Sequence, residues 1–220
     1  MTEPVKRRSY DSPARRAAAA RTRRAVLDAA GRLFAERGWA GTSVAEVARE
    51  AGVSVDTVYT SVGRKPALLL AVHDDLLAEG AGAGPATERD YVRAVRAAVG
   101  ARRKIEVYAE ALGRLLPRTV PLLLALHEAG RDDPDCRALA TAVSERRVAN
   151  MRLFAADLRA TGEVRPDIDD AWVANLVWSM NSPEYVELMG RRGVEGEELA
   201  ALLARVWTAT LLSPGARPGA

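Results

Sequence analysis

Cysteine and histidine are scarce in this sequence. Cys136 is the only cysteine among 220 residues, which excludes an internal disulfide and a cysteine-clustered zinc site. The two histidines, His73 and His127, have no histidine or cysteine companions at metal-ligand spacing. We therefore expect neither a metal site nor a cofactor.

Catalytic signatures are lacking as well. The sequence has no glycine-rich phosphate loop, no Gly-x-Ser-x-Gly elbow and no pair of carboxylates with an evident acid and base role. We expect that the protein is not an enzyme.

Long apolar runs are also missing. No charge-free apolar stretch approaches the roughly 20 residues that a helix needs to cross a bilayer. The N-terminus is charged and lacks the apolar stretch of a secretory signal. With 48% apolar residues the chain can bury one core or two smaller ones. We expect a soluble, cytoplasmic protein that has no membrane partner.

Charge is distributed unevenly along the chain. Residues 1–65 carry 13 Lys and Arg against 7 Asp and Glu, whereas residues 66–220 carry 19 against 22. A basic N-terminal third suits an approach to a polyanion such as nucleic acid, although a solvated surface or tail gives the same pattern.

The first segments read as a basic arm followed by helices. Residues 1–20 are rich in Arg and Ala without a sustained apolar face, so we expect a mobile arm that can be helical toward its end. From Arg21 to Arg37 the apolar residues recur at intervals of three and four, which predicts a helix, and Gly38 ends it.

Two short helices should follow. Ser43 and Glu46 fit a capping box that starts a helix reaching about Glu50. After a break at Gly52, Ser54 is placed to cap a third helix from Val55 to about Ser61.

Pro66 suits the first turn of a fourth helix, and the remainder reads as longer helices without strand-like alternation. The pattern therefore predicts an all-α fold of about nine helices. The later helices are expected near 88–112, 118–130, 134–161, 169–180 and 195–212, with breaks at 113–117, 131–133, 162–166 and 181–183.

The two short helices and the Ala51-Gly52-Val53 turn between them fit a helix-turn-helix. Apolar residues would hold the third helix from behind, leaving its outer face free to enter a major groove about 12 Å wide. The side chains available for contact are Ser54, Val55, Asp56, Thr57, Tyr59 and Thr60.

This segment resembles the N-terminal domain of TetR-type transcription regulators over about 50 residues. The matching positions are Leu33-Phe34, Gly38, Thr42-Ser43, Val47-Ala48, Ala51-Gly52-Val53-Ser54, Thr57-Val58-Tyr59 and Lys65 to Leu68. The resemblance implies a homodimeric repressor whose second domain binds an inducer and pairs with its partner through the last two helices.

The resemblance also implies roles for single residues. Ser43, with Thr42 before it, should approach a phosphate, and Tyr59 and Lys65 should hold the DNA backbone from either end of the recognition helix. Base reading would fall to Val55, Asp56 and Thr60.

Two departures from the family pattern concern the same region. Val62 stands where an aromatic is common, and Arg64-Lys65-Pro66 replaces a Ser-Lys-Glu type of helix start. Asp56 is awkward near phosphates unless it accepts a hydrogen bond from a cytosine amino group or orients a neighbour. The basic arm can compensate by contacting the DNA backbone or the minor groove.

We therefore expect four parts: a flexible arm at 1–20, a helix-turn-helix domain at 21–66, a ligand-binding and dimerisation domain at 67–213 and a disordered tail at 214–220. One helix-turn-helix reads few base pairs, so specific binding requires a dimer. Candidate interface residues on the last helices, which equally suit a monomer core, are Trp172, Leu176, Met180, Leu199, Leu202, Leu203, Val206, Trp207 and Leu211.

A ligand pocket in a helical domain is apolar with a few polar groups. The polar or bulky residues on otherwise apolar helices are Tyr108, His127, Asn150, Met151, Phe154, Trp178 and Asn181. The sequence thus predicts a ligand-responsive regulator that binds a palindromic operator on double-stranded DNA. The alternative is a ligand-binding or interaction protein of the same fold without specific DNA binding, for which Asp56 is the hint.

Overall fold

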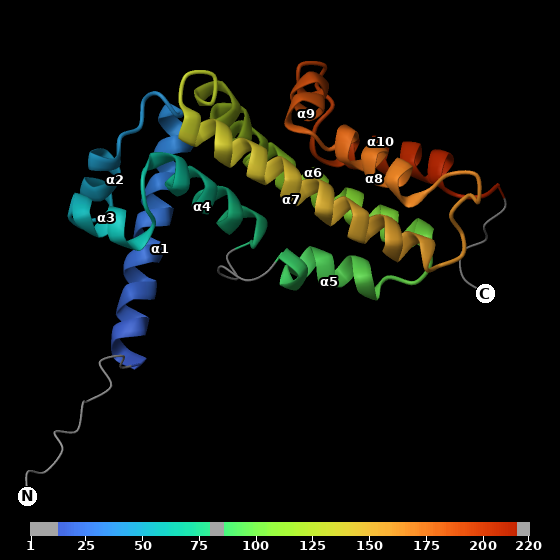
Figure 1. Cartoon of the computed structure of the whole chain (residues 1–220), viewed down its shortest axis with the longest axis horizontal. Helices are drawn as coiled ribbons and strands as arrows, with labels where there is room; N and C mark the ends of the chain where they lie inside the picture. Colours follow the sequence, from blue (N-terminus) through green and yellow to red (C-terminus); the bar gives the residue numbers. More distant parts are fainter. Residues whose placement is uncertain (1–12, 80–85, 215–220) are drawn as a thin grey trace, which may run out of the picture. The chain divides into compact units, whose positions relative to one another are not determined.

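The computed structural model describes residues 13–79 and 86–214, and over these ranges the chain is all-helical, with ten α-helices and one short 3-10 helix (Figure 1). The chain divides between Val72 and His73 into two compact units. Each unit is described by itself.

The first unit is built around α1 (Pro13–Arg37), which contacts both α2 (Val44–Glu50) and α3 (Val55–Ser61). The helix starts at Pro13 and so includes residues 13–20 of the expected arm, whereas residues 1–12 lie outside the described residues. The core of this unit consists of Val26, Leu27, Ala30, Leu33, Phe34, Val47, Ala48 and Val58.

Both predicted helix starts are confirmed. The Ser43 hydroxyl accepts from the Glu46 amide at 3.2 Å while the Glu46 carboxylate accepts from the Ser43 amide at 2.9 Å. The Ser54 hydroxyl accepts from the Thr57 amide at 3.1 Å. Between the two helices Gly52 takes a φ of +67°, a conformation that costs glycine little, so the chain can turn sharply into α3.

The last helix of the first unit continues into the second. α4 (Lys65–Leu77) crosses the boundary between Val72 and His73. Its residues Leu68 and Leu69 belong to the first unit and are fully buried, and His73 belongs to the second unit and is also buried.

The second unit consists of η1 (Ala86–Glu88), α5 (Asp90–Ala97), α6 (Ala101–Ala129), α7 (Pro134–Arg159), α8 (Asp170–Met180), α9 (Pro183–Gly190) and α10 (Gly196–Leu211). α6 is its centre and contacts α5, α7, α9 and α10, while α7 also packs on α8 (Figure 1). A central helix must bury side chains along its length, and the buried residues of α6 run from Ala101 to Leu126.

The expected break at 113–117 is wrong, because α6 runs through it without interruption. Gly113 lies against α10, where an added Cβ would sit 2.5 Å from the Gly196 carbonyl oxygen. Its lack of a side chain therefore serves the close approach of two helices rather than a helix end. Pro117 and Pro121 are tolerated inside the helix at the cost of backbone hydrogen bonds.

The expected continuous helix at 88–112 is also wrong, because the chain breaks at Ala98–Gly100 between α5 and α6. The buried Lys104 ammonium donates to the Val95 and Arg96 carbonyls at 3.1 and 3.0 Å, which closes the end of α5. Glu163 accepts from the Ala101 amide at 3.2 Å and so caps the start of α6.

The turn expected at 181–183 is followed by a helix that was not predicted. Ser182 accepts from the Tyr185 amide at 3.2 Å and Pro183 occupies the first turn, so α9 has a regular helix start. In the described residues there is no strand, only one isolated bridge between Val164 and Leu212. Within the same ranges, no helix is sufficiently long and apolar to span a membrane.

Candidate functional site

One side of α3 is buried against its own unit, and the opposite side is exposed to solvent. Val58 is fully buried, whereas Val55 and Tyr59 are 37% and 47% exposed and rank among the most exposed large apolar side chains of the described chain. Asp56 and Thr60 are exposed beside them. The helix therefore offers four neighbouring side chains that nothing within its own unit covers, as a groove-reading helix must.

The hydroxyl groups of α3 are held in place by local hydrogen bonds. The Ser54 and Thr57 hydroxyls lie 2.8 Å apart, and the Thr60 hydroxyl donates to the Asp56 carbonyl at 2.9 Å. Each oxygen retains acceptor capacity, so these residues can still accept a hydrogen bond from a base amino group.

The residues expected to hold the DNA backbone gather at one place. Tyr59 and Lys65 line a shallow hollow together with Val44, which belongs to the first turn of α2. The Lys65 ammonium donates to the Trp39 carbonyl at 2.5 Å and lies 4.2 Å from the centre of the Trp39 ring. Lys65 thus has a fixed position, and its charge remains at the edge of the hollow.

Thr42 was expected beside Ser43 among the residues that contact DNA, and this expectation is wrong because its side chain does not face solvent. It is only 2% exposed, and its hydroxyl donates to the Leu33 and Gly38 carbonyls at 3.1 and 2.9 Å. This side chain braces the turn between α1 and α2, and cannot reach a phosphate. Ser43 is exposed at the start of α2, and its contact with a phosphate stays a prediction.

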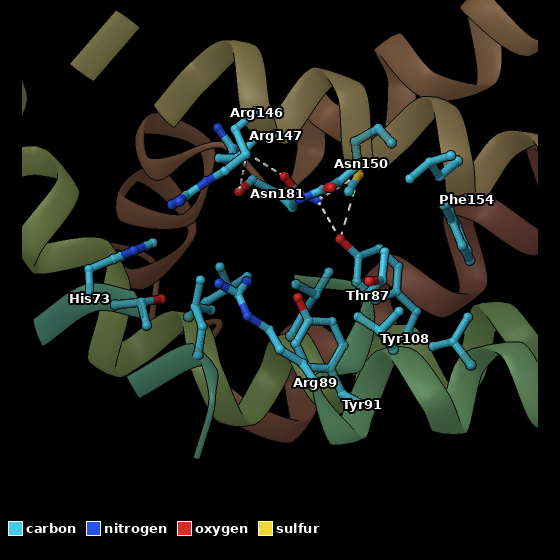
Figure 2. A pocket seen from close by; sticks show the side chains of 18 of the residues that line it. His73, Thr87, Arg89, Tyr91, Tyr108, Arg146, Arg147, Asn150, Phe154 and Asn181 are labelled. Atoms are coloured by element: carbon cyan, nitrogen blue, oxygen red, sulfur yellow. Dashed lines mark hydrogen bonds between the residues drawn. The ribbon is translucent and has the colours of Figure 1, made fainter. Parts of the chain in front are cut away.

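The second unit contains a cavity of about 140 Å³ (Figure 2). Its lining includes five of the seven residues expected in a ligand pocket: Tyr108, Asn150, Met151, Phe154 and Asn181. Leu112, Leu116, Val120 and Leu123 of α6 give it an apolar wall. A volume near 140 Å³ compares with the cavity of about 150 Å³ that holds benzene.

The two remaining candidates lie elsewhere. His127 is on the surface, where Nδ1 is 3.1 Å from the Glu184 carboxylate. Trp178 packs against the core with a buried indole nitrogen that has no hydrogen-bond partner among the described residues. The sequence does not show whether a single aromatic or histidine residue on an apolar helix faces a cavity or the surface. It therefore could not separate His127 and Trp178 from the five residues that line the cavity.

A hydrogen-bonded chain crosses one side of the cavity. Arg147 donates to the Asn181 main-chain and side-chain oxygens and to the Trp178 carbonyl. The Asn181 amide donates to the Tyr108 hydroxyl at 3.2 Å, and that hydroxyl donates to the Met151 sulfur at 3.5 Å. Burial raises the pKa of Tyr108 and lowers that of Arg147. At neutral pH the phenol is therefore uncharged.

A second polar cluster lies on α4 and α7. Arg146 donates to Asp74 through both Nη atoms at 2.7 and 3.1 Å, and Arg89 approaches the same carboxylate at 3.6 Å. Burial alone would raise the pKa of Asp74, but hydrogen bonds from His73 and Arg146 outweigh it, and the pKa falls from 3.8 to about 2. Burial also lowers the pKa of His73, which stays neutral at pH 7.

The sequence reasoning missed the arginines of this cavity. Arg89, Arg146 and Arg147 belong to arginine-rich stretches that look like solvated helix surface. The available signal was the Arg146-Arg147 pair in a helix with apolar residues on both sides. The cavity forms between α5, α6 and α7, and the sequence does not show how these helices pack.

The interface residues expected on the last helices fall into two groups. Leu199, Leu203, Trp207 and Leu211 are fully buried in the core of the single chain and cannot offer their side chains to a partner. Trp172 is 43% exposed, and Leu176, Met180, Leu202 and Val206 are partly exposed. An interface on α8 and α10 would have to use this second group.

Residues 26–72 match the family model of the bacterial regulatory proteins of the tetR family. No curated protein matches the sequence at a significant level. The matched segment covers α2, α3, the second half of α1 and the first part of α4.

Solved structures similar to the whole chain share its fold. A TetR-family regulator from Rhodococcus sp. is 20% identical, with a TM-score of 0.65 over 87% of this chain and 99% of that one. A transcriptional regulator from Saccharomonospora viridis in complex with choline is 20% identical, with a TM-score of 0.67 over 89% and 100%. The transcriptional regulator FadR from Bacillus subtilis in complex with stearoyl-CoA is 16% identical, with a TM-score of 0.64 over 84% and 96%.

Residues 26–72, with the exposed face of α3, therefore form a helix-turn-helix unit of the kind found in bacterial regulatory proteins. More specifically, the N-terminal domain is that of the tetR family, and the chain has the fold of TetR-type regulators.

Proposed function

We propose that this protein is a ligand-responsive repressor that binds a palindromic operator as a homodimer. The observation that carries the proposal is the exposed face of α3, where Val55, Asp56, Tyr59 and Thr60 project from a helix that is capped at its start and held from behind. Ser43 and Lys65 flank this face and would contact phosphates. Since its target is the chromosome, we propose that it acts in the cytoplasm.

A homodimer follows from what DNA recognition requires. One such helix reads only a few base pairs, and two must be held about 34 to 36 Å apart to read two half-sites. The partly exposed apolar residues of α8 and α10, with Trp172 foremost, would form a four-helix bundle with a second copy.

Ligand control is supported by the cavity and by α4. Two similar structures were solved with choline and with stearoyl-CoA. Here α4 buries Leu68 and Leu69 in the DNA-binding unit and carries His73 and Leu77 in the lining of the cavity. A ligand that favours one conformation of this helix over another would change DNA affinity through the same helix.

DNA binding is tested by gel shift with duplex DNA from the region upstream of the protein's own gene. The expected complex weakens steeply between about 50 and 200 mM salt, because bound phosphates release their counterions on complex formation. Tyr59→Phe removes one phosphate contact and should weaken binding about threefold to tenfold at unchanged thermal stability, since Tyr59 is half exposed. Arg131→Gln, an exposed residue of the α6–α7 turn, is the matched control.

The alternative is a ligand-binding or interaction protein of the same fold that lacks specific DNA binding. Asp56, a carboxylate in the middle of the reading face, is the observation that favours it. Binding of random and upstream duplexes with equal, weak affinity would support this alternative and contradict the operator-binding repressor.

A further inference from the structure

The cavity in the second unit is rich in arginine for a space with an apolar wall. Four arginines line it, Arg89, Arg96, Arg146 and Arg147, and the lining includes one carboxylate, that of Asp157. Figure 2 shows Arg89 and Tyr91 on one side of the cavity, and Arg147 and Asn181 on the other. The chemistry of the cavity is therefore set by how these charges are balanced.

The negative charges near the cavity are already engaged. Asp157 accepts from the Lys104 ammonium at 2.9 Å, and Lys104 is 6% exposed. Asp74 is held by both Nη atoms of Arg146, so Arg89 shares a carboxylate that another guanidinium already occupies. Arg147 donates hydrogen bonds to neutral oxygens of Trp178 and Asn181, and Glu184 acts on it at longer range. Positive charge is in excess.

Arg89 is the least satisfied of these groups. It is only 9% exposed, and its Nε is buried with no hydrogen-bond partner among the described residues. Removing a guanidinium from water without a full set of acceptors is costly, and an incoming carboxylate can supply two parallel acceptors. Arg89 is also the N-cap residue of α5, so its backbone position is fixed by the helix start.

The rest of the cavity suits an apolar body of modest size. Leu112, Leu116, Val120 and Leu123 form one wall. The Tyr108 ring stacks on Tyr91 with ring centres 6.3 Å apart and lies tilted against Phe154 at 4.8 Å. The volume of about 140 Å³ has room for a single ring or a short alkyl chain. A cation would meet the arginines without compensation, and a neutral ligand would leave the excess charge unbalanced.

We infer that the effector of this protein is a small amphipathic carboxylate, with its carboxylate at Arg89 and its apolar body against the α6 leucines and the Tyr108–Phe154 rings. The inference rests on the proposed ligand-responsive function and names the chemical class of the ligand. Arg147 and Asn181 close the opposite side of the site.

The test compares probes of one shape and different charge by calorimetric titration of the full chain without DNA. Benzoate and hexanoate carry the carboxylate, benzamide and hexanamide are their neutral counterparts, and benzyltrimethylammonium is the cation. Ligands with so few atoms bind weakly, so titrations extend to about 10 mM. At least one carboxylate should bind at least about tenfold more tightly than its amide, and the ammonium should not bind.

Arg89→Gln should reduce carboxylate affinity about tenfold or more and leave amide affinity unchanged. Arg93→Gln, one turn further along α5 on its exposed side, is the matched control and should behave as the unmodified protein. Arg89→Lys should restore part of the carboxylate affinity because it keeps the charge without the two-nitrogen geometry.

The inference is overturned if an amide or the ammonium binds as tightly as the carboxylates, if no carboxylate binds, or if Arg89→Gln leaves carboxylate affinity unchanged. These results are separable from failure of the proposed function. In the first case the cavity is still a ligand site of another class, and in every case the gel shift reports DNA binding independently.

Discussion

At the scale of single residues, the structure separates side chains that hold the fold from those that are free to act. Thr42 and Ser43 are neighbours in sequence, yet Thr42 is buried and bonded to two carbonyls while Ser43 caps α2 in solvent. Capping signals such as Ser43 and Ser54 were predictable because they depend only on residues three positions apart. The fate of Thr42 depends on the fold of α1 against α2, which local spacing does not encode.

Asp74 gives a prediction for pH dependence. Its pKa lies at about 2 in the folded chain against 3.8 for the free side chain, so it stabilises the fold above pH 4, and this contribution is lost as the pH falls from 3.8 toward 2. Asp74→Asn should lower the free energy of unfolding at pH 6 by at most about 2 kcal/mol, and by less once screening at this one-third exposed group is included.

Urea unfolding at pH 6, 4 and 3 measures this effect. The gap between the variant and the unmodified protein should narrow as the pH falls. Asp132→Asn, in the exposed turn after α6, should change stability at pH 6 by less than about 0.5 kcal/mol. A gap for Asp74→Asn that is absent at pH 6, or constant down to pH 3, contradicts this assignment.

At the scale of elements, the helices themselves were predictable from the sequence, whereas several helix ends in the second unit were not. The short helices of the first unit were expected close to their observed bounds because glycine and serine signals flank them. In the second unit Gly113 and Pro117 mimic a helix end but lie inside α6, where packing on four other helices overrides local preference. The real break at Ala98–Gly100 is stabilised by Lys104 and Glu163, which lie outside it in sequence.

Gly113 gives a prediction in which packing and helix propensity have opposite signs. Alanine inside a helix is favoured over glycine by about 1 kcal/mol, but at Gly113 its Cβ would lie 2.5 Å from the Gly196 carbonyl and 3.0 Å from the Ala200 Cβ. Gly113→Ala should therefore destabilise the protein by about 1 to 3 kcal/mol, as measured by thermal or urea unfolding.

The matched control is Gly31→Ala in α1, where the nearest atom to an added Cβ is a Val72 methyl at the ordinary contact distance of 3.6 Å. This variant should be stabilised by about 0.5 to 1 kcal/mol. Stabilisation by both substitutions would show that α10 does not press on α6 at Gly113.

α3 gives a prediction about specificity. Asp56 is exposed next to Val55 on the reading face, whereas Tyr59 lies at the hollow beside Lys65. Asp56→Ala should relax the base preference at one operator position, by about 1 to 3 kcal/mol, and leave the salt dependence unchanged. Competition binding with operator variants at two salt concentrations measures both effects. A uniform change of affinity over all sequences would mean that Asp56 reads no base.

At the scale of the whole molecule, DNA recognition requires assembly. The exposed Trp172 of α8 and the partly exposed Val206 of α10 are the side chains that the fold leaves available for a second copy. The helices were predictable as candidates, but the division between core and surface was not, because Leu199, Leu203 and Trp207 have the same apolar character and are enclosed by α6 and α8.

Trp172→Glu gives the corresponding prediction. The unmodified protein should have twice the 23.6 kDa chain mass in light scattering, and the variant should shift toward a single chain with unchanged helix content. Val99→Glu, at a side chain that is 82% exposed between α5 and α6, should remain dimeric. If Trp172→Glu stays fully dimeric, the interface does not lie on α8.

The central claim, that paired α3 helices read a symmetric DNA site, is tested most directly by selecting the bound sequences from a random duplex pool. The account predicts a two-fold-symmetric consensus whose half-sites lie about 10 base pairs apart, centre to centre, or a multiple of that spacing. A pool that shows no enrichment, or a consensus without symmetry, would contradict it.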